Sequence, residues 1–501
     1  MPVTVEELAS ALKRMKGGRT GAEDGLVAEM LQTGHSGLLE IIAEFFTDIL
    51  AGKLEPPVDW KVARLSVIFK KGDAKEPSNY RPISIIPVMA KLFSVILYCR
   101  IRETLENLCT EEQYGFRRGR GCDDVNHILK MVVEKSAEWG EELWMAALDV
   151  EKAFDKVYHH ELFNVLLQGK VDASAVFVLR RLYRGMQAYV ALRPGVESRR
   201  FEIQRGVRQG DPLSPVLFNL VLTSVLQELQ VVWQRRGYGT NVGQDLWGHR
   251  LTHVAFADDT TLIARSWVSL KRMVLSLRAA LGKRGLKLHP TKCKAQTNSV
   301  SAQRGVIRIS DDFDLNVLAE EDCLEVLGTN LSPQDPTKAE VKHRIAVAWR
   351  KFWALKASLL NDRVSRKRRL QLFEASVSSS FLFGTHAWTP REDELRMMRS
   401  VQNKMLRRIC HTPRHPTEEW VPWIKRATHR ARQLAQEAGV RDWLQAHAAR
   451  KWHWAGHAAR REASTWLWRV TFWRDSDWNA GALESGLWRP FRPSRRRCHA
   501  G

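Results

Sequence analysis

Two aspartates stand side by side in an otherwise apolar part of the sequence, "HVAFADDTTLIA" at 253–264. The alternation of apolar residues around them predicts two short strands joined by a tight turn. Adjacent carboxylates such as Asp258 and Asp259 repel each other, and burying them is costly unless a cation lies between them. The alternative is a polar turn with no further role, because aspartate is common in turns.

A third carboxylate, Asp149, follows the apolar segment "LWMAAL", which predicts a strand that becomes helical after Asp149. If this strand neighbours the predicted hairpin in one sheet, the three carboxylates meet at one edge. Such a set can hold two cations about 3.5–4 Å apart, which clamp the attacking and leaving oxygens in phosphoryl transfer. The all-oxygen set suits Mg²⁺. Asp149 by itself could instead be a helix N-cap.

The elements that must position these acids can be read from apolar periodicity. One acid before a helix-bearing insert, and two acids in a later hairpin, is the order that a palm-type nucleic-acid polymerase needs. The insert ends in a strand, a glycine-rich turn and a long apolar helix within 199–229. Upstream, amphipathic helices are predicted within 4–50, where Thr4 is a candidate N-cap with Glu7 three residues later. From about residue 337 the pattern is helical, basic and rich in tryptophan. We expect Trp443, Trp452 and Trp454 to pack in a helical core, and the helical pattern to end past Trp466.

The composition points to a polyanionic partner. The chain has 501 residues, with 78 Lys and Arg against 56 Asp and Glu, a formal charge of +22, and 19 Trp. Charge and aromatic content of this kind favour nucleic acid, although a solubilising surface is the alternative. The seven cysteines are scattered without a CxxC pair, which favours a reducing, intracellular compartment. We expect no membrane partner, since the most apolar run, 83–101, is interrupted by Pro87, Lys91 and Arg100.

Seven segments in order carry a resemblance to a known family. They are "KKGDAKEPSNYRPISIIPVMAKLFSVIL" (70–97), "EQYGFRRGRGCDD" (112–124), "LDVEKAFDKV" (148–157), "GVRQGDPLSPVLFNLVL" (206–222), "FADD" (256–259), "GLKLHPTK" (285–292) and "LEVLG" (324–328). Together they resemble the reverse transcriptase of LINE-type non-LTR retrotransposons. The wording of "NYRPISI", "GVRQGDPLSPVLFNL" and "FADD" favours this type over a group II intron maturase or a telomerase-like enzyme.

The resemblance implies an α+β fold of the right-hand polymerase type, with fingers, a palm built on an antiparallel sheet, a helical thumb and a helical basic C-terminal extension. We expect an N-terminal helical extension at 1–60, fingers and palm at 61–330, a thumb at 331–415 and a tryptophan-rich basic region at 416–501. Too few residues precede the first motif for an endonuclease domain, so we expect the polymerase part alone, as a fragment or a degenerate copy.

The resemblance also assigns roles to individual residues. It implies that Asp149, Asp258 and Asp259, with the Val150 carbonyl, bind metal, and that Lys292 protonates or stabilises the leaving pyrophosphate. His289 departs from the asparagine that the family more often has near this lysine. The residues implied to bind the dNTP are Lys70, Lys71, Arg81, Phe154, Gln209 and Gly210. Those implied to bind template or primer are Arg117, Arg118, Arg120 and Gly206.

Several of these assignments have plain structural alternatives. Phe154, implied to exclude a 2′-hydroxyl, could be a core aromatic at helical spacing. Lys70 and Lys71 could form a solvated basic turn, and the three arginines could be simple surface charge. We expect Gly206 and Gly210 to let the backbone approach the template–primer closely.

The function implied is RNA-directed DNA polymerisation, in which a primer 3′-OH attacks the α-phosphate of a dNTP with two Mg²⁺ ions, for which Mn²⁺ is a possible substitute. The partners implied are an RNA template, a DNA primer or target and dNTPs; no protein partner can be inferred. A catalytically inactive nucleic-acid-binding remnant of such an element is the alternative. An intracellular location, nuclear for a eukaryotic element, is expected.

Overall fold

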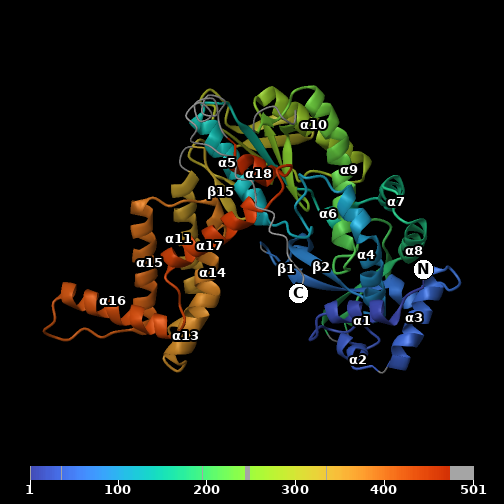
Figure 1. Ribbon diagram of the computed structural model, residues 1–501, viewed down its shortest axis with the longest axis horizontal. Coiled ribbons are helices and arrows are strands. Elements are labelled where there is room, and N and C mark those ends of the chain that lie inside the picture. The colour runs from blue at the N-terminus through green and yellow to red at the C-terminus, as the bar shows by residue number, and fades with distance from the viewer. Residues whose placement is uncertain are drawn as a thin grey trace, which may run out of the picture. The chain divides into compact units, whose positions relative to one another are not determined.

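The computed structural model describes residues 2–34, 36–70, 72–193, 196–242, 249–333 and 336–473 (Figure 1). The chain divides into two compact units. Unit 1 comprises Met1–Val125, Glu141–Tyr238 and Thr252–Gln334, and unit 2 comprises Asn126–Gly140, Gly239–Leu251 and Asp335–Gly501. The predicted boundaries at 60, 330 and 415 stay predictions.

A six-stranded sheet forms the centre of unit 1. Its strands are β3 (Trp144–Leu148), β9 (His253–Phe256), β10 (Asp259–Ala264), β11 (Lys294–Thr297), β12 (Gly305–Ser310) and β13 (Phe313–Val317), in the order β12-β13-β11-β3-β10-β9. The strand β10 pairs antiparallel with both β9 and β3, so that Thr260 faces Leu148. The predicted hairpin and the predicted strand before Asp149 are therefore neighbours in one sheet.

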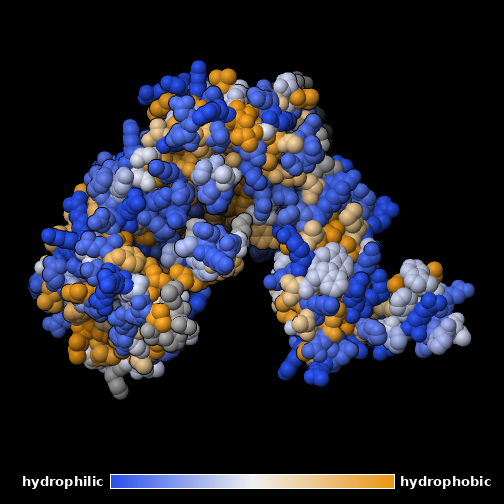
Figure 2. Space-filling view, turned by 180° about the vertical axis from the view of Figure 1, so that it is seen from behind, coloured by the Kyte–Doolittle hydropathy of each residue, from blue (hydrophilic) through white to orange (hydrophobic). Residues whose placement is uncertain are grey.

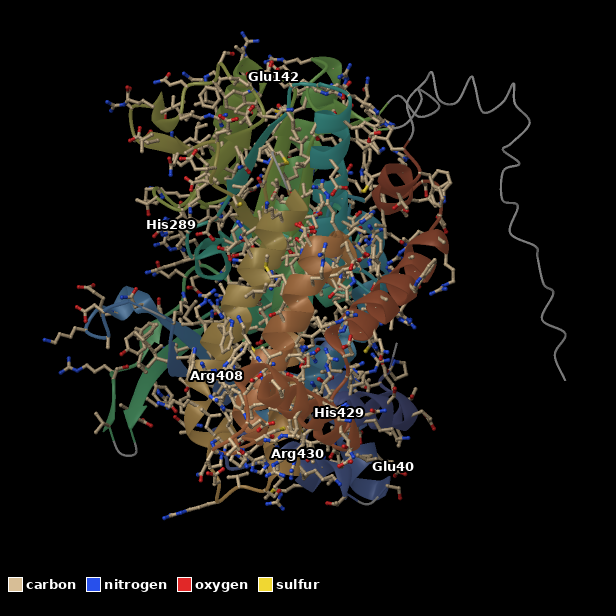
Figure 3. The ribbon with its side chains drawn as sticks, turned by 90° about the vertical axis from the view of Figure 1, so that its left-hand side faces the viewer. Glu40, Glu142, His289, Arg408, His429 and Arg430 are labelled. Carbon is tan, nitrogen blue, oxygen red and sulfur yellow. The ribbon has the colours of Figure 1, made fainter. Side chains whose placement is uncertain are left out.

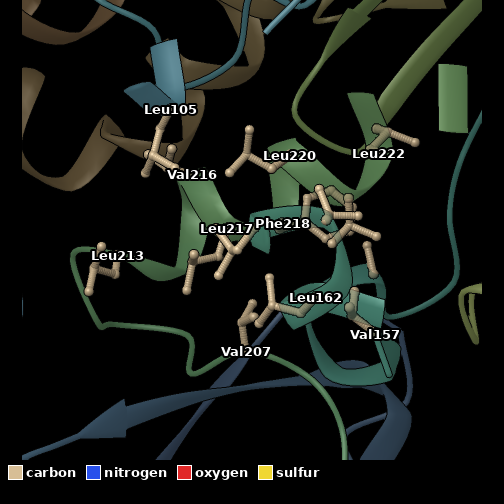
Figure 4. Close-up of a cluster of buried hydrophobic side chains, with 14 of the residues drawn as sticks. Leu105, Val157, Leu162, Val207, Leu213, Val216, Leu217, Phe218, Leu220 and Leu222 are labelled. Carbon is tan, nitrogen blue, oxygen red and sulfur yellow. The ribbon is translucent and has the colours of Figure 1, made fainter. Parts of the chain in front are cut away.

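Helices bury their apolar faces in the core beside this sheet. They are α6 (Ala153–Lys156), α7 (His159–Gln168), α8 (Ala173–Tyr183), α9 (Ser214–Arg235) and α10 (Trp267–Lys283). The helix α10 contacts β3, β10 and β12, α9 packs on α10, α6 and α7, and α8 packs on α7. Figure 4 shows part of the core, where Leu217 and Phe218 of α9 lie close to Leu162 of α7 and to Val207. Among the described residues, α9 alone is long and apolar enough to cross a membrane, but most of its apolar window is buried, and a core helix meets the same criteria.

A second sheet of unit 1 comprises β1 (Val62–Phe69), β2 (Tyr80–Ile85), β4 (Gln187–Arg193), β5 (Val196–Glu197) and β6 (Phe201–Glu202). The strand β1 pairs antiparallel with β2 and parallel with β4. The helices α1 (Val5–Arg14), α2 (Ala28–Gln32), α3 (Ser36–Leu50) and α4 (Val88–Leu108) complete the unit with the hairpin of β14 (Leu324–Val326) and β15 (Thr329–Leu331). As predicted, the Thr4 side chain caps α1 by accepting a hydrogen bond from the backbone N–H of Glu7.

Within its described residues, unit 2 is helical apart from the short pair β7 (Thr240–Asn241) and β8 (Arg250–Leu251). The helices that lie in residues 335–501 are α11 (Pro336–Ala354), α12 (Lys356–Leu359), α13 (Arg366–Leu372), α14 (Ser379–Phe381), α15 (Glu392–Cys410), α16 (Trp420–Glu437), α17 (Trp443–Ala459) and α18 (Trp466–Thr471). A π-helical turn, Phe373–Ser378, joins α13 to α14. The helix α5 (Cys122–Glu138) is divided between the units, since the first segment of unit 1 ends at Val125 and the first segment of unit 2 begins at Asn126.

Tryptophans in unit 2 divide between core and surface. Trp443 is fully buried and stacks on Phe381 with ring centroids 3.9 Å apart, as expected for a packing residue. Trp452 was expected in the core as well, but it is 79% exposed, so that expectation is wrong. Helical rhythm was expected to end at Trp466, yet Trp466 is buried at the start of α18.

Charged groups dominate the surface. In the face seen in Figure 2, hydrophilic residues predominate and hydrophobic ones form scattered patches. In unit 2, α15 and α16 carry basic side chains, including Arg408 and Arg430, which Figure 3 labels. The guanidinium of Arg408 lies 5.3 Å from the ring centre of Trp353. Cations beside exposed aromatic rings suit nucleic acid, in keeping with the charge of the whole chain.

Candidate active site

Three carboxylates converge at one edge of the central sheet. Asp149 directly follows β3, and Asp258 lies in the turn that joins β9 to Asp259, the first residue of β10. Burial, followed by the negative charges of Asp258 and Asp149, raises the pKa of Asp259 to about 6. Burial and the charge of Asp149 also raise the pKa of Asp258. The three side chains therefore lie close enough to repel one another, which is the cost that a bound cation would remove.

The structure decides against the N-cap role for Asp149. The residue at the N-cap of α6 is Lys152, in a left-handed conformation with φ of 47°, so Asp149 does not cap this helix. The backbone of Asp149 instead accepts a hydrogen bond from His289 N at 2.7 Å. Val150 and Leu288 face each other in an antiparallel bridge, and the hydrogen bonds of this bridge run between the residues on either side of them. The Val150 carbonyl therefore points away from the segment that contains Leu288.

Lys292 is paired with the first of these acids. Its Nζ lies 2.8 Å from Asp149 Oδ2. A cavity of about 190 Å³ opens here, and Asp149, Asp259 and Lys292 line it together with Glu325. His289, labelled in Figure 3, stands where the family more often has asparagine, and burial together with the charge of Lys292 lowers its pKa. The imidazole is thus neutral at pH 7 and adds no charge to the site.

The donor set fits a divalent cation chemically. Carboxylate oxygens with raised pKa values are hard ligands that gain stability when a cation neutralises them. In the described part of the chain, however, no three Asp, Glu, His or Cys side chains already form a compact set that could hold a metal by themselves. The Asp149 side chain is hydrogen-bonded to Lys292. Metal binding therefore requires either that the Asp149 side chain turns away from the lysine or that groups from outside the chain supply further ligands.

Phe154 lies at the start of α6, five residues after Asp149. Its ring stacks on Phe218 of α9, with centroids 4.9 Å apart and planes at 22°, and meets the edge of Phe116 at 6.5 Å. The side chain is half-buried. Phe154 therefore packs as a core aromatic on one side and is still partly accessible, which is compatible with the predicted gate.

Gln209 and the glycines around it make contacts within the chain. The side-chain Nε2 of Gln209 donates to Asp155 Oδ1 at 2.8 Å, and the backbone carbonyl oxygen of Gln209 accepts from Ser84 N at 2.7 Å. A Cβ atom on Gly206 would lie 2.7 Å from the Asp155 backbone, and one on Gly210 would lie 2.6 Å from Ser84 O. The close approach expected between these glycines and template–primer is thus, in this structure, an approach to the chain's own backbone.

The predicted phosphate-binding cations border the site from the second sheet. Lys70 follows β1, and Arg81 lies on β2 opposite Ile68; both are exposed. The charge of Arg81 acts to lower the pKa of Asp258. Arg81 is therefore within electrostatic reach of the carboxylates. Lys71 lies outside the described residues.

The three predicted template arginines do not share one environment. Arg117 donates to the backbone oxygens of Thr110, Gln113 and Glu106. Arg120 pairs with Glu111 and lies over the Tyr114 ring. Arg118 is exposed. The guanidinium groups of Arg117 and Arg120 thus hold their own loop together, and the interpretation of these two as simple surface charge is wrong.

The sequence did not predict a role for two residues of the site, Asp155 and Gln113. Asp155 orients the Gln209 amide, and the only signal for it is a second aspartate six residues after Asp149. Gln113 holds the turn between β9 and β10 through its side-chain amide. It belongs to the segment "EQYGFRRG", but a glutamine there does not reveal a partner that lies 144 residues away.

Comparisons with known proteins bear on the same region. Residues 68–331 match the family described as reverse transcriptase (RNA-dependent DNA polymerase). The Pol polyprotein of the retrotransposable element R2 from Popillia japonica is 29% identical over 61% of this chain and 40% of its own length. That of R2DM from Drosophila melanogaster is 31% identical over 54% of this chain and 24% of its own. The chain therefore spans less than half the length of these relatives.

Among solved structures, the telomerase of Candida albicans in complex with a fragment of telomeric RNA aligns with a TM-score of 0.43 and 10% identity. The alignment covers 74% of this chain and 68% of that one. The apo telomerase of Candida tropicalis gives a TM-score of 0.43 and 13% identity over 87% of this chain and 74% of that one.

Proposed function

Because the chain belongs to the reverse transcriptase family, whose members generally use divalent metal ions, we propose that it is an RNA-directed DNA polymerase of a non-LTR retrotransposon. It would extend the 3′-OH of a DNA primer with dNTPs on an RNA template. The observation that carries the proposal is the meeting of Asp149, Asp258 and Asp259 at one sheet edge inside the matched region.

The carboxylates and the Val150 carbonyl are the proposed metal ligands. Two divalent cations, Mg²⁺ with Mn²⁺ as a possible substitute, would lower the pKa of the primer hydroxyl and neutralise the charge that develops on the pyrophosphate. Asp259 and Asp258 must be ionised to bind them, so their raised pKa values make the site sensitive to pH below about 6.

The remaining residues position the substrate. Arg81 and Lys70 carry positive charge at the β1–β2 hairpin of the second sheet, and this charge would bind the triphosphate. The proposed role of Phe154 is to exclude a 2′-hydroxyl, and that of Gln209, fixed by Asp155, is to border the incoming nucleotide. Lys292, already directed at the site by Asp149, is the proposed proton donor to the leaving pyrophosphate.

The experiment that tests the function is dNTP incorporation on an RNA template with a DNA primer in Mg²⁺. Wild type is compared with Asp258→Asn and with Asp314→Asn, which changes an exposed aspartate on β13 of the same sheet. We expect incorporation by wild type and Asp314→Asn, and none by Asp258→Asn, while all three bind template equally. A folded wild type that binds template without incorporation would replace the proposal by the inactive remnant.

A further inference from the structure

The turn that carries Asp258 is held by a segment far away in the sequence. Residues 112–115 run beside β9 and make a parallel bridge between Gln113 and Ala255. Tyr114 N donates to Ala255 O, and Ala255 N donates to Glu112 O, both at 2.8 Å. These backbone hydrogen bonds fix β9 as far as Ala255, two residues before Ala257 in the turn.

Beyond Ala255, the Gln113 side chain makes the hydrogen bonds that hold the turn. Its Oε1 accepts hydrogen bonds from Ala257 N at 3.0 Å and from Gly115 N at 2.9 Å. Its Nε2 donates to Ala257 O at 3.2 Å. Both backbone polar groups of Ala257 are therefore satisfied by a single amide, and Gln113 is only 1% exposed. A buried amide with both ends bonded in this way fixes the position of its partner.

Ala257 needs this support because its backbone is strained. Its φ is 56°, a left-handed conformation that is unfavourable for a residue with a side chain. Asp258 follows it directly, so the conformation of Ala257 sets the direction in which the Asp258 carboxylate leaves the hairpin. Relaxation of Ala257 to an ordinary conformation would turn Asp258 away from Asp149.

The segment 112–115 packs tightly between the turn at Ala257 and the helix α9. A Cβ atom on Gly115 would lie 2.2 Å from Ala257 N, so the two backbones touch. The side chain of Asn219 on α9 donates to Gly115 O, and Gln230 Nε2 on the same helix bonds Glu112 Oε1 at 2.7 Å. The segment 112–115 is thus anchored on α9, and it transmits that rigidity to the hairpin.

We propose that Gln113 is a positioning residue for the metal site, which acts by holding Ala257 in its left-handed conformation so that Asp258 faces Asp149. The expected effect of Gln113 on turnover rests on the proposed function. The expected effect of Gln113 on cation binding can be measured without turnover. Gln113 touches no reacting atom, so its loss should change kcat and cation affinity rather than the KM for template or dNTP.

The test compares Gln113→Met with the double variant Gln113→Met/Ala257→Gly. Methionine keeps the length of the side chain but removes both hydrogen-bonding ends, and glycine adopts a positive φ without strain. For Gln113→Met we expect kcat to fall about 10–100-fold and the Mn²⁺ dissociation constant, measured by electron paramagnetic resonance, to rise about 10-fold. The added Ala257→Gly should restore much of kcat and much of the Mn²⁺ affinity, because glycine adopts the positive φ of the turn without support from Gln113.

Gln402→Met is the matched control, because Gln402 of unit 2 is also a buried glutamine whose amide bonds backbone at both ends, at Arg441 O and Trp443 N. It should lose stability while Mn²⁺ binding stays at the wild-type level. Unchanged Mn²⁺ binding in Gln113→Met, or a loss that Ala257→Gly does not relieve, would overturn the inference. If wild type binds Mn²⁺ but does not polymerise, the proposed function fails while the Mn²⁺ measurements still decide the role of Gln113.

Discussion

Lys292 Nζ lies 2.8 Å from Asp149 Oδ2, so a lysine ammonium is bonded to one of the three acids that would bind metal. The lysine therefore neutralises Asp149 in the metal-free protein and must give up this bond when a cation binds. We predict that Lys292→Met tightens Mn²⁺ binding a few-fold, since one competing positive charge is lost. We also predict that it lowers kcat about 100-fold or more, since the proposed proton donor to pyrophosphate is lost.

Isothermal titration with Mn²⁺ and single-turnover incorporation measure the two effects separately. Lys294→Met, two residues later on β11 and exposed, is the control and should change neither quantity. If Lys292→Met weakened Mn²⁺ binding, the lysine would be supporting the metal site rather than competing with it.

The raised pKa of Asp259 makes stability depend on pH. An acid whose pKa is higher in the folded than in the unfolded state stabilises the fold while it is protonated, and this contribution is lost as the pH rises through the folded value. For Asp259 the window runs from about 3.8 to about 6. Burial of Asp259 is only partial, so water screens part of the repulsion, and we expect a loss of about 1 kcal/mol.

Urea denaturation at pH 4.5 and pH 7.5 in the presence of EDTA measures this loss. In Asp259→Asn the part of the pH dependence that belongs to this carboxyl should disappear, and the variant should be the more stable protein at pH 7.5. Added Mg²⁺ should stabilise the wild type at pH 7.5 and leave the variant nearly unaffected. Equal pH dependence in the two proteins would contradict the prediction.

Phe154 should control the choice of sugar. Because Phe218 stacks on its ring, Phe154 cannot turn aside easily when a 2′-hydroxyl approaches. We predict that Phe154→Ala raises kcat/KM for rNTPs relative to dNTPs at least about 10-fold. Phe218→Leu removes the stacking partner but keeps the Phe154 ring, and should raise this ratio only about 2–3-fold. A ratio unchanged in Phe154→Ala would leave Phe154 a packing residue of α6 and α9.

The sequence was sufficient for the carboxylates because their neighbours encode strands directly. Alternating apolar residues predicted β9 and β10, and a short apolar run predicted β3, so that only the pairing of the strands had to be assumed. The structure supplies that pairing through the register of Thr260 with Leu148. Asp149 was ambiguous in sequence, because an aspartate between a strand and a helix also suits an N-cap.

Side-chain partners distant in the chain could not be predicted. Gln113 bonds Ala257, and Gln209 bonds Asp155, over separations of 144 and 54 residues, and no local pattern encodes either contact. Gly206 and Gly210 were predicted to approach template–primer, and in this structure they instead approach the protein backbone, at Asp155 and Ser84. Composition alone also could not separate buried Trp443 from exposed Trp452, since both lie on α17 and only tertiary packing distinguishes their faces.

Arg117 and Arg118 are neighbours that should fail in different ways. Arg117 donates to three backbone oxygens, and its replacement by alanine leaves these acceptors without their donor, which we expect to cost about 2–3 kcal/mol of unfolding free energy. Arg118 is exposed, so Arg118→Ala should leave stability within about 0.5 kcal/mol. If Arg118 contacts a template phosphate, the slope of log affinity against log salt should fall by about 0.7–0.9. Thermal denaturation and template titrations at several salt concentrations measure both quantities, and an Arg118→Ala slope equal to that of wild type would remove Arg118 from the template surface.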